Sequence, residues 1–362
     1  MEWFESFGFE INPYSKIDPY TIPLDKLVWN RTDLKDVRKK LDKFVEDIFN
    51  GNRVGLKIFG PTASGKTWLI RIIEKEILSK KDGMVFIYTK IPKLDPTFSV
   101  IYRIAIENFI EKYMKKLTDY VSKQEGQTNL DAWIKVLVNE DLAKCFQQIS
   151  SKSPNDFIAK RWLSGDKISS TELNAIKVSS SLDSDYKKFE MLKNLLKQLS
   201  KIFPSIILVI DELENASTRF AGQVSETLRE ILDEFSEKFG LICAFTAQKL
   251  EEWYDIGYTE SLERRLDYVM ELDSLKKDAI SDFLGMHHKV YRKTDFEVKN
   301  DLYPFNEKGA ISLLEVSDTR FHYPGFFLPN CQEILRLAFD KKIKEINAEF
   351  VKNHADVLRF RR

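Results

Sequence analysis

The 362-residue sequence lacks the features that define several large classes of protein. It has only three cysteines, scattered at positions 145, 243 and 331. Their spacing matches neither a disulfide framework nor a zinc site, which favours a reducing compartment. No apolar run reaches 18 residues and no signal peptide is visible, so we expect a soluble, cytoplasmic protein without a membrane partner.

Charge of one sign is not in excess, and histidine is scarce. Lysine plus arginine and aspartate plus glutamate number 56 each, so no global charge attracts the chain to nucleic acid or to a membrane. This balance does not exclude a local basic stripe. Of the four histidines, only His287 and His288 are adjacent. Two imidazoles fall short of the ligand count of a metal site, so we expect this pair at a solvated helix end.

The strongest positive signal is a phosphate-binding motif. Residues Gly60–Thr67 read GPTASGKT and match the pattern G-x-x-x-x-G-K-[ST], with an apolar, strand-like run before them and a helical pattern after them. In such a loop, backbone N–H groups and the helix N-terminus bind phosphate, Lys66 reaches the β- and γ-phosphates, and the Thr67 hydroxyl is a ligand of Mg²⁺. The expected nucleotide contacts are Gly60, Pro61, Thr62, Ala63, Ser64, Gly65, Lys66, Thr67 and Trp68.

A second motif follows far downstream, where an apolar run at 206–210 ends in Asp211 and Glu212. In a protein with a phosphate-binding loop, the first carboxylate, Asp211, holds Mg²⁺ and the second, Glu212, polarises a water for attack on the γ-phosphate. Alone, two carboxylates would indicate a solvated strand end. Together with the loop they predict a Mg²⁺-dependent ATPase, and a base directly after the metal-binding aspartate favours hydrolysis over phosphoryl transfer to a small molecule.

The rest of the chain alternates strand-like and helical patterns. We expect strands at 84–88 and 241–246, a helix from Asp33 to Gly51, and a helix with the stripe 224–235 closed by Gly240. Residues 92–203 are mostly helical, and the serine-rich stretch 165–185 within them reads as a loop or a set of short helices.

This alternation predicts an α/β fold: the parallel sheet of a P-loop NTPase, with a helical insertion and a C-terminal helical lid domain. Ligands of such sheets lie at the carboxyl ends of the strands, where Gly60, Asp211 and Thr246 all fall. The expected domains are an extended arm at 1–30, an ATPase core at 31–272 with the insertion at about 92–203, and the lid at 273–362.

With these motifs in place, the chain resembles the AAA+ ATPases. It is most similar to the origin-recognition and initiator-like branch and to relatives in transposition control and phage defence. The resemblance rests on the arm at 7–14, the helix that begins near Arg31, the two motifs, the strand at 241–246 and the lid-like stretch from 301 to 350. It covers nearly the whole chain, but only the two motifs are specific.

The resemblance implies further site residues. Thr246, or Gln248 in its place, would be the sensor that hydrogen-bonds the γ-phosphate or the attacking water. Arg31 would contact the nucleotide. Arg264 and Arg265 lie where such proteins place an arginine finger, which completes the site of a neighbouring subunit; the alternative is an ordinary solvated pair before a strand.

The sequence departs from the family in two places. Relatives carry an arginine after a proline at the start of a lid helix, as a second sensor, but here Gly325 follows Pro324. Arg320 is the one candidate to replace it. Initiators also append a winged-helix DNA-binding domain, and we expect none here. The insertion at 92–203 is larger than an initiator needs, and we expect it to contact a partner or DNA.

The favoured function is an ATP-dependent switch that assembles as a homo-oligomer and acts on duplex DNA or on a DNA-processing protein effector, in transposition, replication or phage (antiviral) defence. The first alternative is a signalling or scaffold module without DNA, and the second is a small-molecule kinase. A translocating helicase is a further possibility, but we see no pore-loop signature in the sequence. The DNA hypothesis also draws on four basic runs, each of which alone is best explained as a solvated surface. They are Lys115-Lys116, Lys187-Lys188, Lys341-Lys342 with Lys344, and Arg359 to Arg362.

Overall fold

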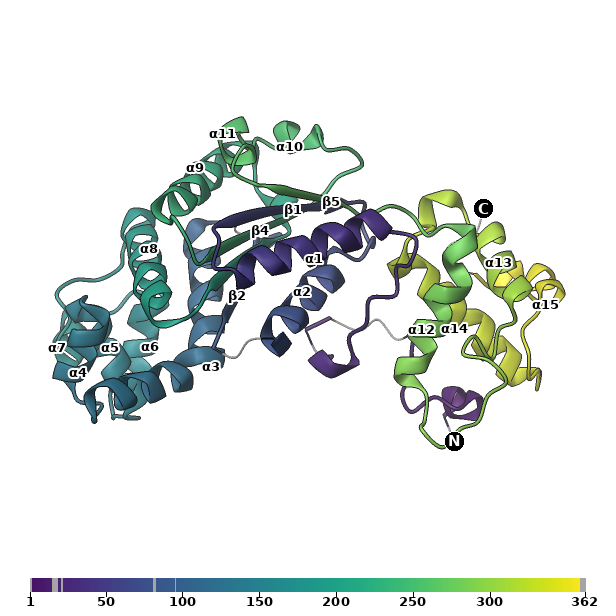
Figure 1. The fold of residues 1–362 in the computed structure, drawn as a ribbon, viewed down its shortest axis with the longest axis horizontal. Coiled ribbons are helices and arrows are strands. Elements are labelled where there is room, and N and C mark those ends of the chain that lie inside the picture. Colours follow the sequence, from purple (N-terminus) through teal and green to yellow (C-terminus); the bar gives the residue numbers. More distant parts are fainter. Residues whose placement is uncertain (1, 15–18, 21, 81–82, 95, 359–362) are drawn as a thin grey trace. The chain divides into compact units, whose positions relative to one another are not determined.

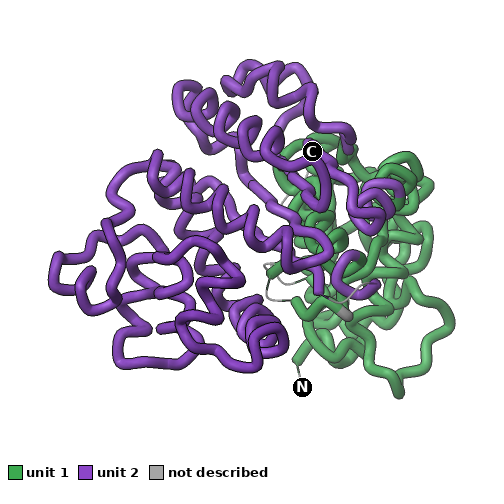
Figure 2. Tube along the Cα trace, turned by 60° about the vertical axis from the view of Figure 1, so that its left-hand side comes forward, with its two compact units in different colours: residues 1–42, 60–76, 271–362 green, residues 43–59, 77–270 purple. Residues whose placement is uncertain are grey.

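The computed structural model describes residues 2–14, 19–20, 22–80, 83–94 and 96–358. The chain divides into two compact units, coloured separately in Figure 2. The first unit consists of residues 1–42, 60–76 and 271–362, and the second of residues 43–59 and 77–270. The chain crosses from one unit to the other within α1 (Lys35–Phe49) and α2 (Lys66–Lys80) and at two strand ends.

A five-stranded parallel sheet has the strand order β2-β3-β4-β1-β5. Every residue of β1 and β3 is buried, as expected for strands covered on both faces. In the β2–β3 pair Val85 lies opposite Ile206, and Lys90 lies opposite Asp211. The predicted α/β class with a parallel sheet is therefore confirmed. The strands are β1 Val54–Gly60, β2 Val85–Lys90, β3 Ile206–Asp211, β4 Phe239–Thr246 and β5 Tyr268–Glu271.

One hydrophobic core joins this sheet to the helices that cover it. The apolar stripes of α3 (Phe98–Glu125), α8 (Asp185–Ile202) and α9 (Thr218–Glu234) bury themselves against strand residues. The prediction that Gly240 closes α9 is wrong, because the helix ends at Glu234 and Gly240 lies inside β4. A Cβ at Gly240 would lie 2.6 Å from Ile48 Cδ1, so close packing explains the glycine.

Between β2 and β3 the chain forms a helical insertion, with α4–α7 gathered beyond α3 and α8 (Figure 1). The serine-rich stretch 165–185 contains one short helix, α7, flanked by irregular backbone. The remaining helices of the insertion are α4 Leu130–Leu137, α5 Glu140–Ser150, α6 Asp156–Leu163 and α7 Ser170–Ile176. A 3-10 turn, Leu213–Asn215, follows β3, and two short helices, α10 Glu252–Asp255 and α11 Glu260–Glu263, lie between β4 and β5.

The first unit contains the helical lid and the N-terminal arm. Phe7, Phe9 and Tyr14 are buried in the same core as the lid helices, so this part of the N-terminal segment packs on the lid. The lid consists of α12 Ile280–Tyr291, α13 Glu307–Val316, α14 Pro324–Asp340 and α15 Ala348–Asn353, with 3-10 turns at Lys277–Ala279, Thr319–Phe321 and Ala355–Val357. The arm has 3-10 turns at Trp3–Phe7 and Leu24–Lys26. Within the described ranges no helix has the length and apolarity needed to cross a membrane.

The prediction that His287 and His288 end a solvated helix is wrong. Both imidazoles of α12 are buried under the arm. His287 Nε2 lies 2.6 Å from the carbonyl oxygen of Pro13, and His288 Nε2 hydrogen-bonds the Tyr14 hydroxyl. Burial lowers the pKa of His287 to about 4, and it lowers the pKa of His288 well below its usual value. The pair is therefore a neutral part of the lid core.

Candidate nucleotide-binding site

The phosphate-binding motif forms the loop between β1, which ends at Gly60, and α2, which begins at Lys66. Gly65 has a φ of +103°, a conformation that favours glycine, and nothing lies within 4 Å of the place where a Cβ would stand. The Lys66 ammonium donates to the carbonyl oxygens of Gly60 (2.8 Å) and Pro61 (3.0 Å). A cation, open space above Gly65 and a helix N-terminus are thus brought together, as phosphate binding requires.

The Ser64 hydroxyl of this loop and Arg31 Nη1 of the same unit are buried and have no hydrogen-bond partner among the described residues. The rest of the Arg31 guanidinium is held firmly, by both oxygens of Asp33 at 2.9 Å and by the carbonyl oxygens of Asp273 (2.8 Å) and Ser274 (3.2 Å). Buried polar atoms are rarely left unpaired in proteins, so both atoms fit a polar ligand that the chain itself does not supply.

Within the same unit, the start of α14 contacts the loop, and Trp68, directly after the loop, contacts Val28. Gly325, the second residue of α14, donates its N–H to the Ala63 carbonyl oxygen at 3.0 Å. A Cβ at Gly325 would lie 2.7 Å from Ala63 Cβ, so the place of the expected second-sensor arginine has no room for a side chain. The indole N–H of Trp68 donates to the Val28 carbonyl (3.1 Å). Arg320 pairs with Asp318 at 2.8 Å, and 79% of its side chain is exposed.

In the second unit, Asp211 ends β3 with its carboxylate buried. One oxygen accepts from the Tyr88 hydroxyl at 3.2 Å and the other from the Glu212 N–H at 2.8 Å. Glu212 has a φ of +57°, which is uncommon for a residue with a side chain. Such strained conformations cost about 1–3 kcal/mol and concentrate at functional sites.

Two residues that the sequence analysis missed hold the predicted catalytic side chains. The Asn215 amide donates to Glu212 Oε2 (3.0 Å) and to the Ile91 carbonyl (2.8 Å). Glu214 accepts both the Thr246 hydroxyl (2.5 Å) and the Thr246 N–H (3.0 Å), so the predicted sensor is fixed at the end of β4. The alternative sensor, Gln248, is exposed. For Asn215 the available signal was its place three residues after Glu212, whereas the Glu214–Thr246 pair has no local signal because 32 positions separate the two residues.

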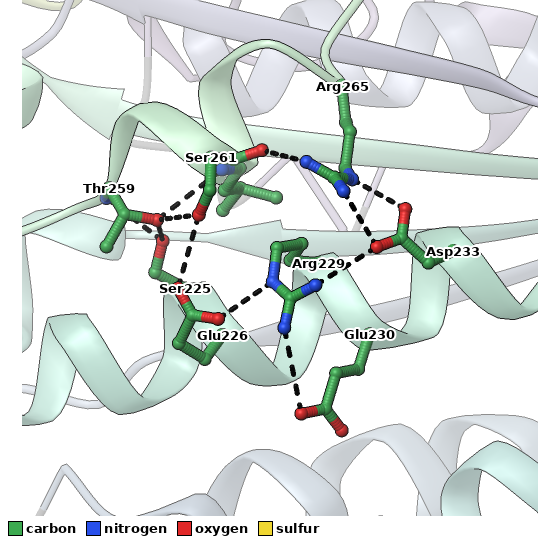
Figure 3. A network of polar contacts seen from close by, with 9 residues as sticks. Ser225, Glu226, Arg229, Glu230, Asp233, Thr259, Ser261 and Arg265 are labelled. Carbon is green, nitrogen blue, oxygen red and sulfur yellow. Dashed lines mark hydrogen bonds and ion pairs between the residues drawn. The ribbon is translucent and has the colours of Figure 1, made fainter.

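The two candidate finger arginines differ sharply. Arg264 has 74% of its side chain exposed and pairs only with Glu260, one turn earlier, among the ion pairs of the described chain. Arg265 makes a two-pronged contact with Asp233 (2.5 and 2.9 Å) and donates to the Ser261 carbonyl (2.6 Å). Figure 3 shows Arg265 turned toward α9. Of the two arginines, only Arg264 is exposed enough to reach a second molecule, by giving up its surface pair with Glu260.

No group of three or more histidine, cysteine, aspartate or glutamate side chains suited to a metal exists among the described residues. A Mg²⁺ ion that accompanies a nucleotide is usually held by one or two carboxylates, waters and substrate phosphates. The predicted ligands, Thr67 and Asp211, provide hard oxygen donors of the right kind. The strands that end at Gly60, Asp211 and Thr246 are neighbours in the sheet order β3-β4-β1.

Comparison with known proteins identifies the fold. No protein-family model matches the sequence, and no curated protein does. The structure is similar to the Aeropyrum pernix ORC2 protein in its ADPNP–ADP complexes, with a TM-score of 0.55, 10% identity, and coverage of 90% of this chain and 68% of ORC2. It is also similar to Cdc6p from Pyrobaculum aerophilum, with a TM-score of 0.51, 13% identity, and coverage of 93% and 72%. At these identities the likeness establishes the fold alone, an α/β fold with the parallel sheet of a P-loop NTPase.

Proposed function

We propose that this protein is a Mg²⁺-dependent ATPase that works as an oligomeric switch on duplex DNA or on a DNA-processing protein. The observation that carries the proposal is the loop Gly60–Thr67, which is formed between a parallel strand and a helix and accompanied by unpaired polar atoms on Ser64 and Arg31. The ORC2 structure that this fold resembles contains ADPNP and ADP, which supports an adenine nucleotide as the ligand.

The proposed roles follow from the chemistry of each group. The loop N–H groups and Lys66 bind the phosphates, and Arg31 donates its unpaired Nη1 to the nucleotide. Bound Mg²⁺ would neutralise charge on the phosphates, held by Thr67 and Asp211. Glu212 polarises the attacking water while Asn215 keeps its carboxylate in place, and Thr246 senses the γ-phosphate.

Assembly of the oligomer places Arg264 in a neighbouring subunit's site. Its exposure and its single surface ion pair support this role, since such pairs contribute only about 0–1 kcal/mol and are easily given up. An arginine finger raises the hydrolysis rate by about 10³–10⁵-fold. Arg265, bound to Asp233, does not fit the finger role and instead holds the segment in place.

The decisive experiment measures ATP binding and phosphate release in variants of the two motifs. Lys66→Ala removes a charge from the phosphate site and should abolish ATP binding, while Glu212→Gln should bind ATP as the wild type does and lose hydrolysis, because only the base is lost. Glu230→Gln makes the same chemical change on the exposed face of α9 and should be fully active. Phosphate release at the wild-type rate by Glu212→Gln would contradict the proposal.

A further inference from the structure

Three consecutive charged residues, Glu263, Arg264 and Arg265, point to three different environments. Glu263 forms an ion pair with the Lys57 ammonium, and Lys57 is a β1 residue with only 1% of its side chain exposed. The Lys57 ammonium also lies 5.3 Å from the centre of the Trp253 ring. Arg265 is bound to α9, and Arg264 between them is exposed. The segment is therefore fixed on both sides of Arg264, which is exposed and pairs with Glu260 on the surface.

The α9 side of this arrangement is a closed polar network (Figure 3). Thr259 and Ser225 share a hydrogen bond between their hydroxyls (2.7 Å), and Ser261 donates to Glu226 (3.2 Å). Arg229 then joins the network along the helix; its contacts are Glu226 Oε2 at 2.7 Å and Asp233 Oδ2 at 3.2 Å.

Arg265 closes the network, and its two hydrogen bonds to Asp233 lower the pKa of that carboxyl. Two parallel Arg–carboxylate bonds fix geometry as well as energy.

The start of the same segment is bonded to the backbone that follows the candidate catalytic residue Glu212. The buried Tyr258 hydroxyl donates to the Leu213 carbonyl oxygen at 2.9 Å, and Leu213 directly follows Glu212. Burial raises the pKa of Tyr258 well above its usual value, so the hydroxyl remains a donor. The segment 258–265 is thus hydrogen-bonded at both ends. Tyr258, its first residue, bonds Leu213, and Arg265, its last, bonds Asp233.

Stability does not explain these groups well. A buried lysine in a central strand loses its hydration, and replacing buried ion pairs by apolar residues is often neutral or stabilising. A buried pair such as Lys57–Glu263 instead holds the segment that contains Glu263 in a single orientation. A group held in place before the reaction acts in the transition state without reorganisation, and a displacement of about 1 Å costs about 10²-fold in rate.

We propose that Lys57, Asp233 and Arg265 are positioning residues, which hold the segment 258–265 so that Arg264 is presented outward to the nucleotide of a neighbouring subunit. This inference rests on the proposed function, because Arg264 acts only within an assembly. Lys57 fixes the segment to β1, the strand that runs into the phosphate-binding loop, and Asp233 fixes it to α9.

The test separates the molecule that donates the arginine from the molecule that hydrolyses ATP. Arg264→Ala keeps its own loop and base but donates no finger, whereas Glu212→Gln donates a finger but has no base. Each variant alone should be nearly inactive, and mixing them should restore phosphate release at sites formed between them. If the mixture stays inactive while the wild type is active, the shared site of the proposed function is wrong, and the positioning role fails with it.

Asp233→Asn is then added to one member of the pair at a time. In the finger donor, the Glu212→Gln chain, it should lower the restored rate by about tenfold to a hundredfold. In the Arg264→Ala chain, which supplies the hydrolysing site, it should change the rate less than twofold. Arg265→Lys in the donor keeps the charge but loses the two-pronged contact, so it should give a smaller loss of the same kind. Glu230, whose one ion pair among the described residues is with Arg229 at 3.9 Å, provides the matched control, and Glu230→Gln should have no effect in either chain.

An equal loss in both chains would mean that Asp233 serves folding or assembly alone, and it would overturn the proposal. No loss in the donor would do the same. Circular dichroism of each Asp233→Asn chain identifies a variant that has not folded, and Lys57→Met in the donor then replaces it. This second variant removes the buried charge but keeps an unbranched side chain, and the same donor-only loss is expected.

Discussion

At position 325 the lid helix carries no side chain where it contacts the phosphate-binding loop. A Cβ there would lie 2.7 Å from Ala63 Cβ, and the Gly325 N–H bonds the Ala63 carbonyl oxygen. Gly325→Ala should therefore destabilise the fold by about 1–3 kcal/mol, the usual cost of an added methyl group in a packed site. Because the loop must move to accept it, ATP affinity should fall as well. Denaturant unfolding and equilibrium titration with ATP measure the two effects.

Gly285→Ala in α12 is the matched control. A Cβ at Gly285 would lie 3.6 Å from Asp301 Cβ, which is an ordinary contact, and alanine is the better helix former. We expect unchanged or slightly higher stability and unchanged ATP affinity. If Gly325→Ala behaves like this control, the lid and the loop are not as closely packed as we describe.

The residues of the two motifs could be located from the sequence because phosphate and Mg²⁺ chemistry imposes fixed types at fixed spacing. The structure confirms that the Gly60–Thr67 motif lies between a strand and a helix and that Asp211 ends a buried strand. The partners of these residues were not predictable. Glu214 bonds Thr246 from 32 positions away, and Lys57 pairs with Glu263 across 206 positions, so nothing local marks either pair.

At the scale of the element, periodic apolar stripes predicted the sheet strands and the long helices well, and local polarity misled in two places. Gly240 reads as a helix terminator, yet its real constraint is the side chain of Ile48, far away in the chain. His287 and His288 stand before the charged residues Lys289 and Arg292 and so look solvated. The arm residues that cover them are more than 270 positions earlier.

The buried histidines make the packing of the arm on α12 sensitive to acid. The pKa of His287 is about 4 in the folded chain and about 6.5 in the unfolded chain. Above pH 6.5 the imidazole is therefore neutral in both states, and its protonation takes nothing from the free energy of unfolding. As pH falls from 6.5 toward 4 only the unfolded chain takes up the proton, and the free energy of unfolding should drop by up to about 3 kcal/mol. His288 shifts in the same direction and adds to this loss.

Urea unfolding at several pH values between 4.5 and 7.5 measures this dependence. His287→Gln keeps a donor for the Pro13 carbonyl and removes the titrating group, so its stability should depend less on pH in this range. His354→Gln makes the same change at a half-buried position of the lid and should follow the wild type. Equal pH dependence in all three proteins would contradict the assigned role of His287.

At the scale of the whole molecule, the basic runs that motivated a DNA partner are not equivalent. Lys188 is buried and donates to the Ser99 hydroxyl (2.8 Å), and Lys187 pairs with Asp183 at 2.9 Å. Both lysines of this run therefore have partners within the insertion. Lys341, Lys342 and Lys344 are all exposed at the end of α14. Arg359 to Arg362 lie outside the described residues. Lys115 and Lys116 of α3 are exposed as well, so the runs on α3 and after α14 are the candidates for contact with phosphates.

Duplex DNA binding by the ATP-bound assembly should accordingly fall steeply with salt, with a slope of log K against log salt of about −0.9 for each phosphate contacted. Sequence preference should be weak, because phosphate contacts carry no direct sequence information. Changing Lys341 and Lys342 to glutamine should make the slope shallower by about two contacts, whereas Lys187→Gln should leave it unchanged. The measurement is a duplex titration at several salt concentrations, with and without a non-hydrolysable ATP analogue. If no binding occurs at low salt in the ATP state, the oligomer acts on a protein effector and not on DNA.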